Sequence, residues 1–360
     1  MAYSAIVANP RTILKTIKRT ALGISKGLGI FSMLENSRWR RERLTILCYH
    51  GIALDDEHLW DPALYMSAER FKERLRLLAE GGYKVLPLGE AIQRLYARDL
   101  PPKSAAITFD DGTYDFYRQA YPALRHYGFP ATVYLTTFYC RHPKPVFRLF
   151  CSYVLWKAGQ VGGERTVLGK GPFRLDEADQ RDRALEAVTG YATQECISLE
   201  QRDALAERLT CELGLDYQTL AARRILQLMN AEEVREMVAG GIDIQLHTHR
   251  HRTPLDRALF VREITDNRHE IEQMTGTEAV HFCYPSGVHR PEFLPWLADN
   301  GVLSATTCEP GLATAQDHPL LLPRIVDHEG LAAVELEAWL SGVGAALPRR
   351  RRSQRSAENP

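Results

Sequence analysis

The sequence predicts an α/β fold in which helices cover a largely parallel sheet. Short apolar strands alternate with amphipathic helical stretches from residue 44 to about residue 135, and the alternation resumes after about residue 227. A repeated strand-helix-strand order favours parallel strands joined by crossover helices. At 360 residues, the chain is long enough for one large domain with extensions.

The first part of this pattern has clear element boundaries. Ser67 has the position of an N-cap, and Gly81 and Gly128 stand where helices should end. Strands are expected at 44–49, 84–87, 105–109 and 131–135, with helices at 68–80, 88–97 and 114–127 between them.

The second part starts at Asn230, which forms a capping-box pattern with Glu233. Strands are expected at 242–246, 280–284, 303–306 and 323–326, and helices at 231–239, 259–274 and 291–300. Residues 140–227 lack strands of comparable strength and predict a mostly helical insertion. The expected organisation is therefore an N-terminal extension (1–43), a catalytic domain (44–345) with this insertion, and a basic disordered tail (346–360).

Charge is balanced overall but uneven along the chain. Lys plus Arg and Asp plus Glu total 45 each, so nucleic acid is not an expected partner. Both ends are basic. The stretch from Ile13 to Met33 mixes apolar and basic residues, which suits an amphipathic helix on an anionic membrane surface or one packed on the domain. Both alternatives remain open at this point.

The cysteine pattern favours a reducing compartment. The seven cysteines are an odd number without CxxC spacing, which argues against a disulfide framework and a thiolate zinc site. The apolar stretch Ala21 to Leu34 contains Lys26 and does not make a convincing secretory signal. We therefore expect a cytoplasmic protein, with peripheral contact at the inner membrane through the N-terminus as an additional prospect.

Ionisable residues gather where strands are expected to end. His50, the pair Asp110-Asp111, His247 and Tyr284 each follow or end such a strand. In parallel barrels the carboxyl ends of the strands form the face on which active sites are built. An isolated Asp-Asp-Gly is more often a turn, but two adjacent carboxylates can also divide the tasks of metal binding and proton transfer.

The segment from His247 to His251 predicts a metal site. We expect the two imidazoles, four residues apart, to lie on one face of a helical turn and hold one ion together with a carboxylate. Such a donor set suits Zn²⁺, with Co²⁺, Ni²⁺ or Fe²⁺ as alternatives. A surface histidine-rich turn is the competing interpretation. His249 is expected to be solvent-exposed, and Cys283 a small buried hydrophobic residue.

Several motifs resemble those of the polysaccharide deacetylases, the NodB-homology domain of carbohydrate esterase family 4. Thr108-Phe109-Asp110-Asp111-Gly112 is similar to the first motif of that family, and His247-Thr248-x-x-His251 to the second. The segments beginning at Cys48, Phe282 and Leu322 resemble the branch with an N-terminal Tyr-His pair. The resemblance covers about residues 44 to 330, and the insertion matches least well.

The resemblance implies a distorted (β/α)7 barrel with a metal site. Asp111, His247 and His251 would bind a divalent ion, usually zinc, and Asp110 would be the general base. The backbone N–H of Tyr284 would stabilise an oxyanion.

The sequence departs from the family pattern in two places, and in each the role of the missing residue is assigned to another one. The arginine that many members carry in the third motif is absent, and Arg324 is the expected substitute that holds Asp110. The acid that protonates the departing amine is expected to be His50, with His328 as the rival.

The resemblance implies removal of N-acetyl groups from amino sugars of a bacterial surface polysaccharide or its precursor. A second expectation is a deacylase or deformylase of a lipid-linked sugar at the cytoplasmic membrane face. A non-catalytic glycan-binding barrel is a third, against which the complete set of aspartates and histidines argues.

Overall fold

The computed structural model describes residues 10–346, and its centre is a distorted barrel of parallel strands. The strands follow one another in the order β1 (Arg43–Tyr49), β5 (Ser104–Phe109), β6 (Thr132–Leu135), β9 (Asp243–Leu246), β10 (His281–Cys283) and β11 (Ser304–Thr306), with β13 (Ile325–Val326) on the other edge of β1. A parallel bridge between Thr306 and Leu322, just before β13, brings the two ends of the sheet together. The predicted (β/α)7 barrel is confirmed.

Short strands complete the edges of this sheet. β4 (Lys84–Val85) pairs with the first half of β5, and β6 pairs with its second half, so two strands share one edge. β12 (Ala313–Thr314) runs antiparallel to the start of β1. β2 (Gly51–Ile52) and β3 (Tyr65–Met66) form a small sheet within the loop after β1.

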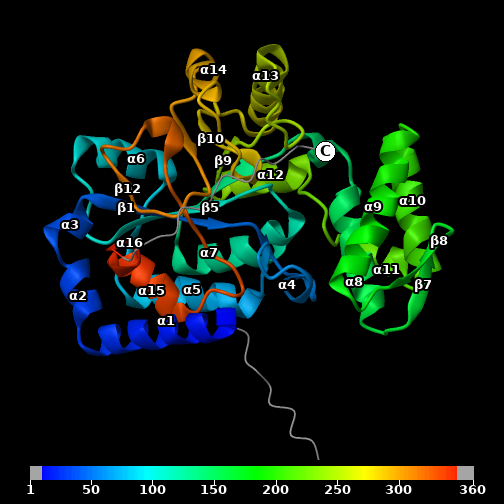
Figure 1. Cartoon of the computed structure of the whole chain (residues 1–360). Helices are drawn as coiled ribbons and strands as arrows, with labels where there is room; N and C mark the ends of the chain where they lie inside the picture. Colours follow the sequence, from blue (N-terminus) through cyan, green and yellow to red (C-terminus); the bar gives the residue numbers. More distant parts are fainter. Residues whose placement is uncertain (1–9, 347–360) are drawn as a thin grey trace, which may run out of the picture.

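Helices cover the outside of the barrel (Figure 1). They are α5 (Ala68–Glu80), α6 (Leu88–Ala97), α7 (Tyr121–Tyr127), α12 (Ala231–Ala239), α13 (Arg257–Thr275) and α14 (Phe293–Asp299). The Ser67 cap and the Asn230-Glu233 capping box are present as predicted. The helix expected at 114–127 is divided into a π-helical turn (Phe116–Ala120) and α7, since Pro122 has no N–H to continue a regular pattern.

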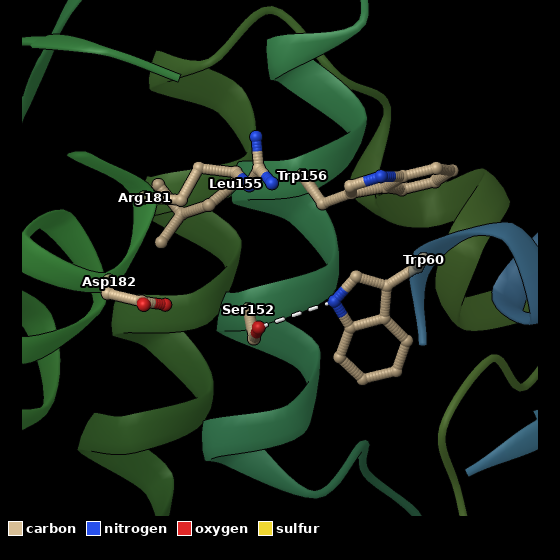
Figure 2. A pocket seen from close by; sticks show the side chains of 6 residues that line it. All are labelled: Trp60, Ser152, Leu155, Trp156, Arg181 and Asp182. Carbon is tan, nitrogen blue, oxygen red and sulfur yellow. Dashed lines mark hydrogen bonds between the residues drawn. The ribbon is translucent and has the colours of Figure 1, made fainter. Parts of the chain in front are cut away.

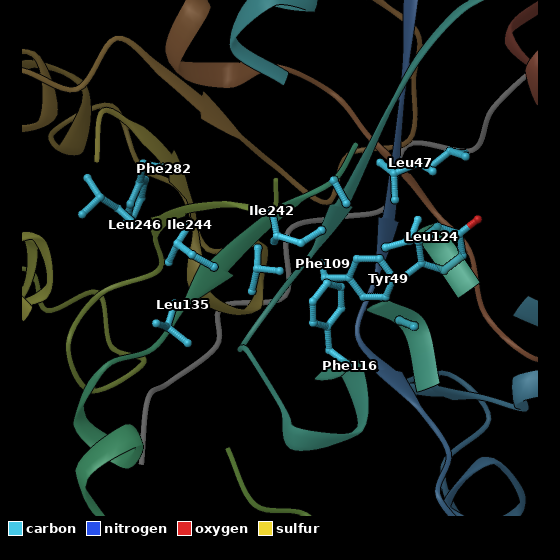
Figure 3. Close-up of a cluster of buried hydrophobic side chains, with 14 of the residues drawn as sticks. Leu47, Tyr49, Phe109, Phe116, Leu124, Leu135, Ile242, Ile244, Leu246 and Phe282 are labelled. Atoms are coloured by element: carbon cyan, nitrogen blue, oxygen red, sulfur yellow. The ribbon is translucent and has the colours of Figure 1, made fainter. Parts of the chain in front are cut away.

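The strands present two differently composed faces. Tyr49 and Phe109 point toward the helix layer, where their rings lie 5.3 Å apart and Phe109 packs on Phe116 at 4.6 Å (Figure 3). Because side chains alternate along a strand, the neighbouring Cys48 belongs to the opposite face, and Cys283 of β10 lies beside it there. Both thiols contact Asp110. The inner face at this end of the barrel is therefore polar.

The insertion has its own hydrophobic core and stands to one side of the barrel (Figure 1). It follows a 3₁₀ turn (Phe138–Arg141) and contains α8 (Phe147–Gly159), β7 (Glu164–Val167), β8 (Lys170–Arg174), α9 (Ala178–Gln194), α10 (Leu199–Glu212) and α11 (Tyr217–Ala222). The β7-β8 hairpin was not expected from the sequence. Its strands are mostly exposed and lack an apolar alternation, and Leu168, at φ 50°, is not a usual turn residue.

The loop after β1 joins the insertion to the barrel. It carries α4 (Glu57–Trp60), and the Trp60 indole N–H donates to the Ser152 hydroxyl at 3.3 Å (Figure 2). Asp56 pairs with Lys157 at 2.7 Å. A cavity of about 160 Å³ lies at this junction, also lined by Trp156 and Asp182. The same loop begins at His50, so the insertion is connected directly to a predicted site residue.

The N-terminal extension packs on the barrel. α1 (Pro10–Gly27), α2 (Ile30–Glu35) and α3 (Arg38–Arg41) lie beside α15 (Ala333–Ser341) and α16 (Val343–Ala346). Lys18 and Arg19 both pair with Glu335. No helix among residues 10–346 combines the length and apolar character needed to span a bilayer. Apart from Ala346, the predicted basic tail lies outside the described residues.

Candidate active site

The polar end of the barrel collects side chains from several strands. His50 follows β1, Asp110 and Asp111 follow β5, and His247 follows β9. All four lie at carboxyl ends of neighbouring parallel strands, so the sheet alone brings them into one small volume.

The Asp-Asp-Gly turn separates the two carboxylates. Asp110 continues the strand, because its N–H donates to the Tyr49 carbonyl at 3.0 Å. Asp111 and Gly112 then adopt left-handed conformations, at φ 71° and 81°. A Cβ on Gly112 would lie 2.2 Å from a methyl carbon of Leu135, so only glycine fits there. Strain of this kind is typical of functional sites.

Asp111, His247 and His251 form a compact group that could hold a metal ion. One oxygen of Asp111 lies 3.2 Å from Nε2 of His247 and 3.3 Å from Nε2 of His251. Ligand atoms about 2.0–2.1 Å from a tetrahedral zinc ion are about 3.4 Å from one another. The donor set and its spacing therefore suit such an ion, with a coordination position left for water or substrate.

Neighbouring groups fix the orientation of His247. Its Nδ1 lies 2.9 Å from the Cys283 carbonyl, which can only accept, so Nδ1 carries the proton and Nε2 keeps its lone pair. Its backbone N–H donates to the side chain of Asn267, and this amide in turn donates to the Leu135 carbonyl. The imidazole is thus prepared as a metal ligand before any ion binds.

The segment 247–251 is not a helical turn, which corrects the geometry expected from the spacing. Thr248 and His251 have positive φ values of 64° and 57°, and Glu263 of α13 accepts from the N–H groups of His249 and Arg250. This irregular loop, rather than a helix, brings the two imidazoles together. His249 is half-buried beside the Thr137 hydroxyl at 2.9 Å, so it is not the exposed residue expected.

Asp110 is held by a buried ion pair with Arg324. Each carboxylate oxygen lies 2.7 Å from a guanidinium nitrogen, and Arg324 also donates to the Thr307 carbonyl. Burial opposes the charged carboxylate, but the charge and hydrogen bonds of Arg324 outweigh it and hold the pKa of Asp110 well below its usual range. Asp110 is therefore ionised at neutral pH.

Two thiols complete the surroundings of Asp110. The Sγ atoms of Cys48 and Cys283 lie 3.5 and 3.4 Å from the same carboxylate oxygen. Burial raises the pKa of both thiols well above the ordinary value, which keeps them protonated and makes them poor metal ligands. Cys283 is therefore a hydrogen-bond donor to the site in addition to the buried residue expected.

The structure places His50 and His328 in different surroundings. Nε2 of His50 lies 3.7 Å from Asp110, at the mouth of the site. His328 accepts a hydrogen bond from the N–H of Gly330, near Lys15 of α1. The geometry thus favours His50 over His328 as a group that meets a substrate at Asp110.

The Tyr284 N–H, which the resemblance implies as an oxyanion donor, has a backbone acceptor in this structure. It donates to the Thr306 carbonyl at 3.3 Å and continues the ladder between β10 and β11. The side chain is buried, and its hydroxyl donates to the Leu320 carbonyl. The sheet pairing therefore already uses the donor that the family pattern assigns to catalysis.

Supporting residues that the sequence motifs did not single out hold the site in place. Asp115 accepts from the N–H of Ile52 at 2.8 Å and from the Thr113 hydroxyl at 3.0 Å, which ties the loop after His50 to the loop after Asp111. Asn267 and Glu263 occupy buried positions of α13. A polar residue in the apolar stripe of a helix was the sequence signal that could have identified Asn267 and Glu263.

Comparison with known proteins identifies this set of motifs. The family model described as "Polysaccharide deacetylase" matches residues 97–150 and 217–305, on both sides of the insertion, and so includes the aspartate pair and both metal-site histidines. In these two segments the chain matches the polysaccharide deacetylase family.

Curated members of the deacetylase family match short parts of this chain. The Bacillus subtilis polysaccharide deacetylase YxkH is 35% identical over 94 residues, 26% of this chain and 32% of its own length. The Escherichia coli poly-β-1,6-N-acetyl-D-glucosamine N-deacetylase is 26% identical over 102 residues, 28% of this chain and 15% of its own length. The matched segments thus span a third or less of these relatives.

Solved deacetylase structures share the fold over most of the chain. The Streptococcus pyogenes deacetylase PplD, in complex with acetate, superposes with a TM-score of 0.55 at 19% identity and covers 83% of this chain and 98% of its own. IcaB from Ammonifex degensii gives 0.52 at 18% identity, with 83% and 97% covered. At these identities the likeness establishes the barrel fold.

Replacement of His251 should remove the metal. His251→Ala deletes one of three candidate ligands, so the purified variant should contain much less divalent ion than the parent, as elemental analysis would show. His249→Ala is the matched control, because His249 belongs to the same loop but contacts Thr137. Equal metal content in the parent and His251→Ala would remove His251 from the ligand set.

Asp115 should make stability depend on pH. Burial, opposed by its hydrogen bonds, raises the pKa of Asp115 to about 8. The folded state therefore binds the proton more tightly than the unfolded state. The contribution of protonated Asp115 to the free energy of unfolding is fully present below about pH 4. Between about pH 4 and pH 8 this contribution falls by about 1.4 kcal/mol per pH unit.

Asp115→Asn should keep the acceptor oxygen and lose this decline. Urea unfolding across that pH range would show a flatter profile than the parent, whereas Asp179→Asn, on the exposed start of α9, should follow the parent. Parallel profiles for the parent and Asp115→Asn would contradict a buried, neutral Asp115.

Proposed function

We propose that this protein is a metal-dependent hydrolase that removes N-acetyl groups from amino sugars of a bacterial surface polysaccharide or its precursor. The observation that carries the proposal is the ligand-like grouping of Asp111, His247 and His251 beside the ionised Asp110 and His50. The name of the E. coli relative, a poly-N-acetylglucosamine N-deacetylase, supports a polysaccharide of N-acetylated hexosamine as the substrate class.

The proposed metal ion is Zn²⁺, with Co²⁺, Ni²⁺ or Fe²⁺ as alternatives for the same ligands. Such an ion supplies Lewis acidity for the acyl carbonyl and lowers the pKa of a water molecule. Asp111 and the two histidines would hold it, and His247 is already in the required tautomer.

Asp110 is the proposed general base. Arg324 fixes both carboxylate oxygens, so the side chain has one orientation and is ionised at neutral pH before it accepts a proton. A carboxylate with a low pKa is a weak base, and for that reason it needs a water molecule made more acidic by its surroundings. Arg324 acts here through Asp110 as a positioning residue.

His50 is the proposed general acid. Hydrolysis forms a bond from the water oxygen to the acyl carbon and breaks the bond from that carbon to nitrogen. Asp110 takes the proton of the water, and His50 gives a proton to the departing amine. The 3.7 Å separation of Nε2 of His50 and the Asp110 carboxylate supports this division of roles, because a proton donor and an acceptor that close can serve one reacting group.

A second candidate is a deacylase or deformylase of a lipid-linked sugar. The observation that favours it is the set of exposed apolar residues on α1, which suits work near a membrane. Release of formate or a longer acid from a lipid-linked amino sugar, in place of acetate from soluble oligomers, would select this candidate. A glycan-binding barrel without catalysis would release neither.

Asp110→Asn should retain the metal and lose turnover. Acetate release from N-acetylglucosamine oligomers should fall by at least about a hundredfold, because the variant lacks the proton acceptor. The parent should lose the same activity on chelation and regain it with zinc. Because the variant leaves the buried Arg324 without a counterion, metal content and thermal unfolding must show that it folds.

Unchanged turnover in a folded, metal-loaded Asp110→Asn would exclude Asp110 as the base. A parent that binds metal but releases no acetate would direct the search to the lipid-linked substrate.

His50→Ala should slow hydrolysis by about 10²–10⁴-fold without loss of metal. His328→Ala is the paired variant and should keep most of the activity, because His328 lies near α1. Steady-state rates and elemental analysis of both variants decide between them. The reverse outcome, an active His50→Ala and an inactive His328→Ala, would assign the acid to the C-terminal histidine.

A further inference from the structure

α1 presents its apolar side to solvent. Ile13, Ile17 and Ile24 are 47, 59 and 59% exposed, and spacings of four and seven residues place them on one face. Leu28, in the turn directly after α1, is 73% exposed. Leu14, at 69%, extends this stripe. Seven of the fifteen exposed large hydrophobic residues in the described part of the chain lie between residues 13 and 33. These exposed hydrophobic residues therefore form a patch and are not scattered singly over the surface.

The charged side of α1 faces the protein instead. Lys18 and Arg19 lie 3.1 and 2.9 Å from the carboxylate of Glu335 on α15, and Lys26 lies 2.6 Å from Glu337. A helix that only packs on a domain buries its apolar stripe and exposes its charges. α1 buries Leu22 against Phe31 and Ala338 but leaves its isoleucines in solvent, so packing on the domain accounts for Leu22 and not for them.

The charge of α1 favours an anionic partner. Its sequence contains five basic residues and no acidic one: Arg11, Lys15, Lys18, Arg19 and Lys26. The two glutamates of α15 offset part of this charge. Lys18 and Lys26 remain 51% exposed in spite of their ion pairs, and long lysine side chains of this kind reach anionic headgroups while their stems cover apolar surface.

A bilayer surface fits this face better than a second copy of the chain. Figure 1 shows α1 along one edge of the molecule, with α15 on its inner side, so the whole length of the helix is accessible to a flat surface. Two copies of α1 packed together would bring like charges close to one another. An apolar stripe on a helix whose charged residues are all basic is the composition of a helix that lies in the plane of a membrane interface.

We propose that the outward face of α1, formed by Ile13, Leu14, Ile17 and Ile24, docks this protein on an anionic lipid surface together with Leu28 in the turn that follows. Apolar side chains enter the boundary between headgroups and acyl chains, and Lys18, half exposed and four residues after Leu14, reaches the lipid phosphates at the border of the stripe. This inference does not depend on the proposed hydrolytic function.

Vesicle flotation of the full chain tests the proposal. The parent should float with phosphatidylcholine vesicles that contain phosphatidylglycerol, and much less with phosphatidylcholine alone. The double variant Ile17→Asp and Ile24→Asp should lower binding by about tenfold or more, because it places charges in the apolar stripe. Val161→Asp is the matched control, since Val161 is 79% exposed but belongs to the insertion.

The variants also separate this proposal from the enzymatic one. Ile17→Asp with Ile24→Asp should keep the parent's thermal stability and its acetate release from soluble oligomers. The proposal is wrong if the parent does not bind anionic vesicles, or if the double variant binds as well as Val161→Asp. A third outcome also contradicts the proposal: light scattering shows that the parent is a dimer and the double variant a monomer, and the parent does not bind vesicles.

Discussion

The buried ion pair between Asp110 and Arg324 is the interaction on which the rest of the site depends. Arg324 stands just before β13, the strand that returns to β1, and Asp110 stands at the end of β5 on the other side of β1. Fully buried charges cost several kcal/mol each unless they are paired. The pairing of β13 and β5 with the two edges of β1 therefore brings Arg324 to Asp110, so that neither buried charge lacks a partner.

This pair also explains how two adjacent aspartates take different environments. Asp110 continues β5 and faces Arg324, while the left-handed backbone at Asp111 turns the next carboxylate toward the histidines. The change of backbone direction at Asp111 thus separates the carboxylate that pairs with Arg324 from the carboxylate that belongs to the candidate metal site. The protonated thiols of Cys48 and Cys283 add donors to the first carboxylate without adding charge.

Much of the barrel could be predicted from the sequence because its strands are short apolar runs with marked helix caps between them. The spacing of the two histidines also predicted that they would meet, although the reason was wrong. The positive φ values of Thr248 and His251 depend on contacts with α13, which no local pattern contains. The acceptor of the Tyr284 N–H could not be predicted for a similar reason, since it comes from another strand.

The return of Arg324 to Asp110 has a consequence for the order of assembly. The two residues are 214 positions apart, so the insertion and most of the barrel must be synthesised before the carboxylate obtains its counterion. Contacts between segments so distant in sequence form late and slowly. A ribosome-bound chain can complete the helical insertion, which has a core of its own, while the catalytic end of the barrel still lacks its closing strand. Truncated chains that stop short of this arginine would thus remain without a finished site.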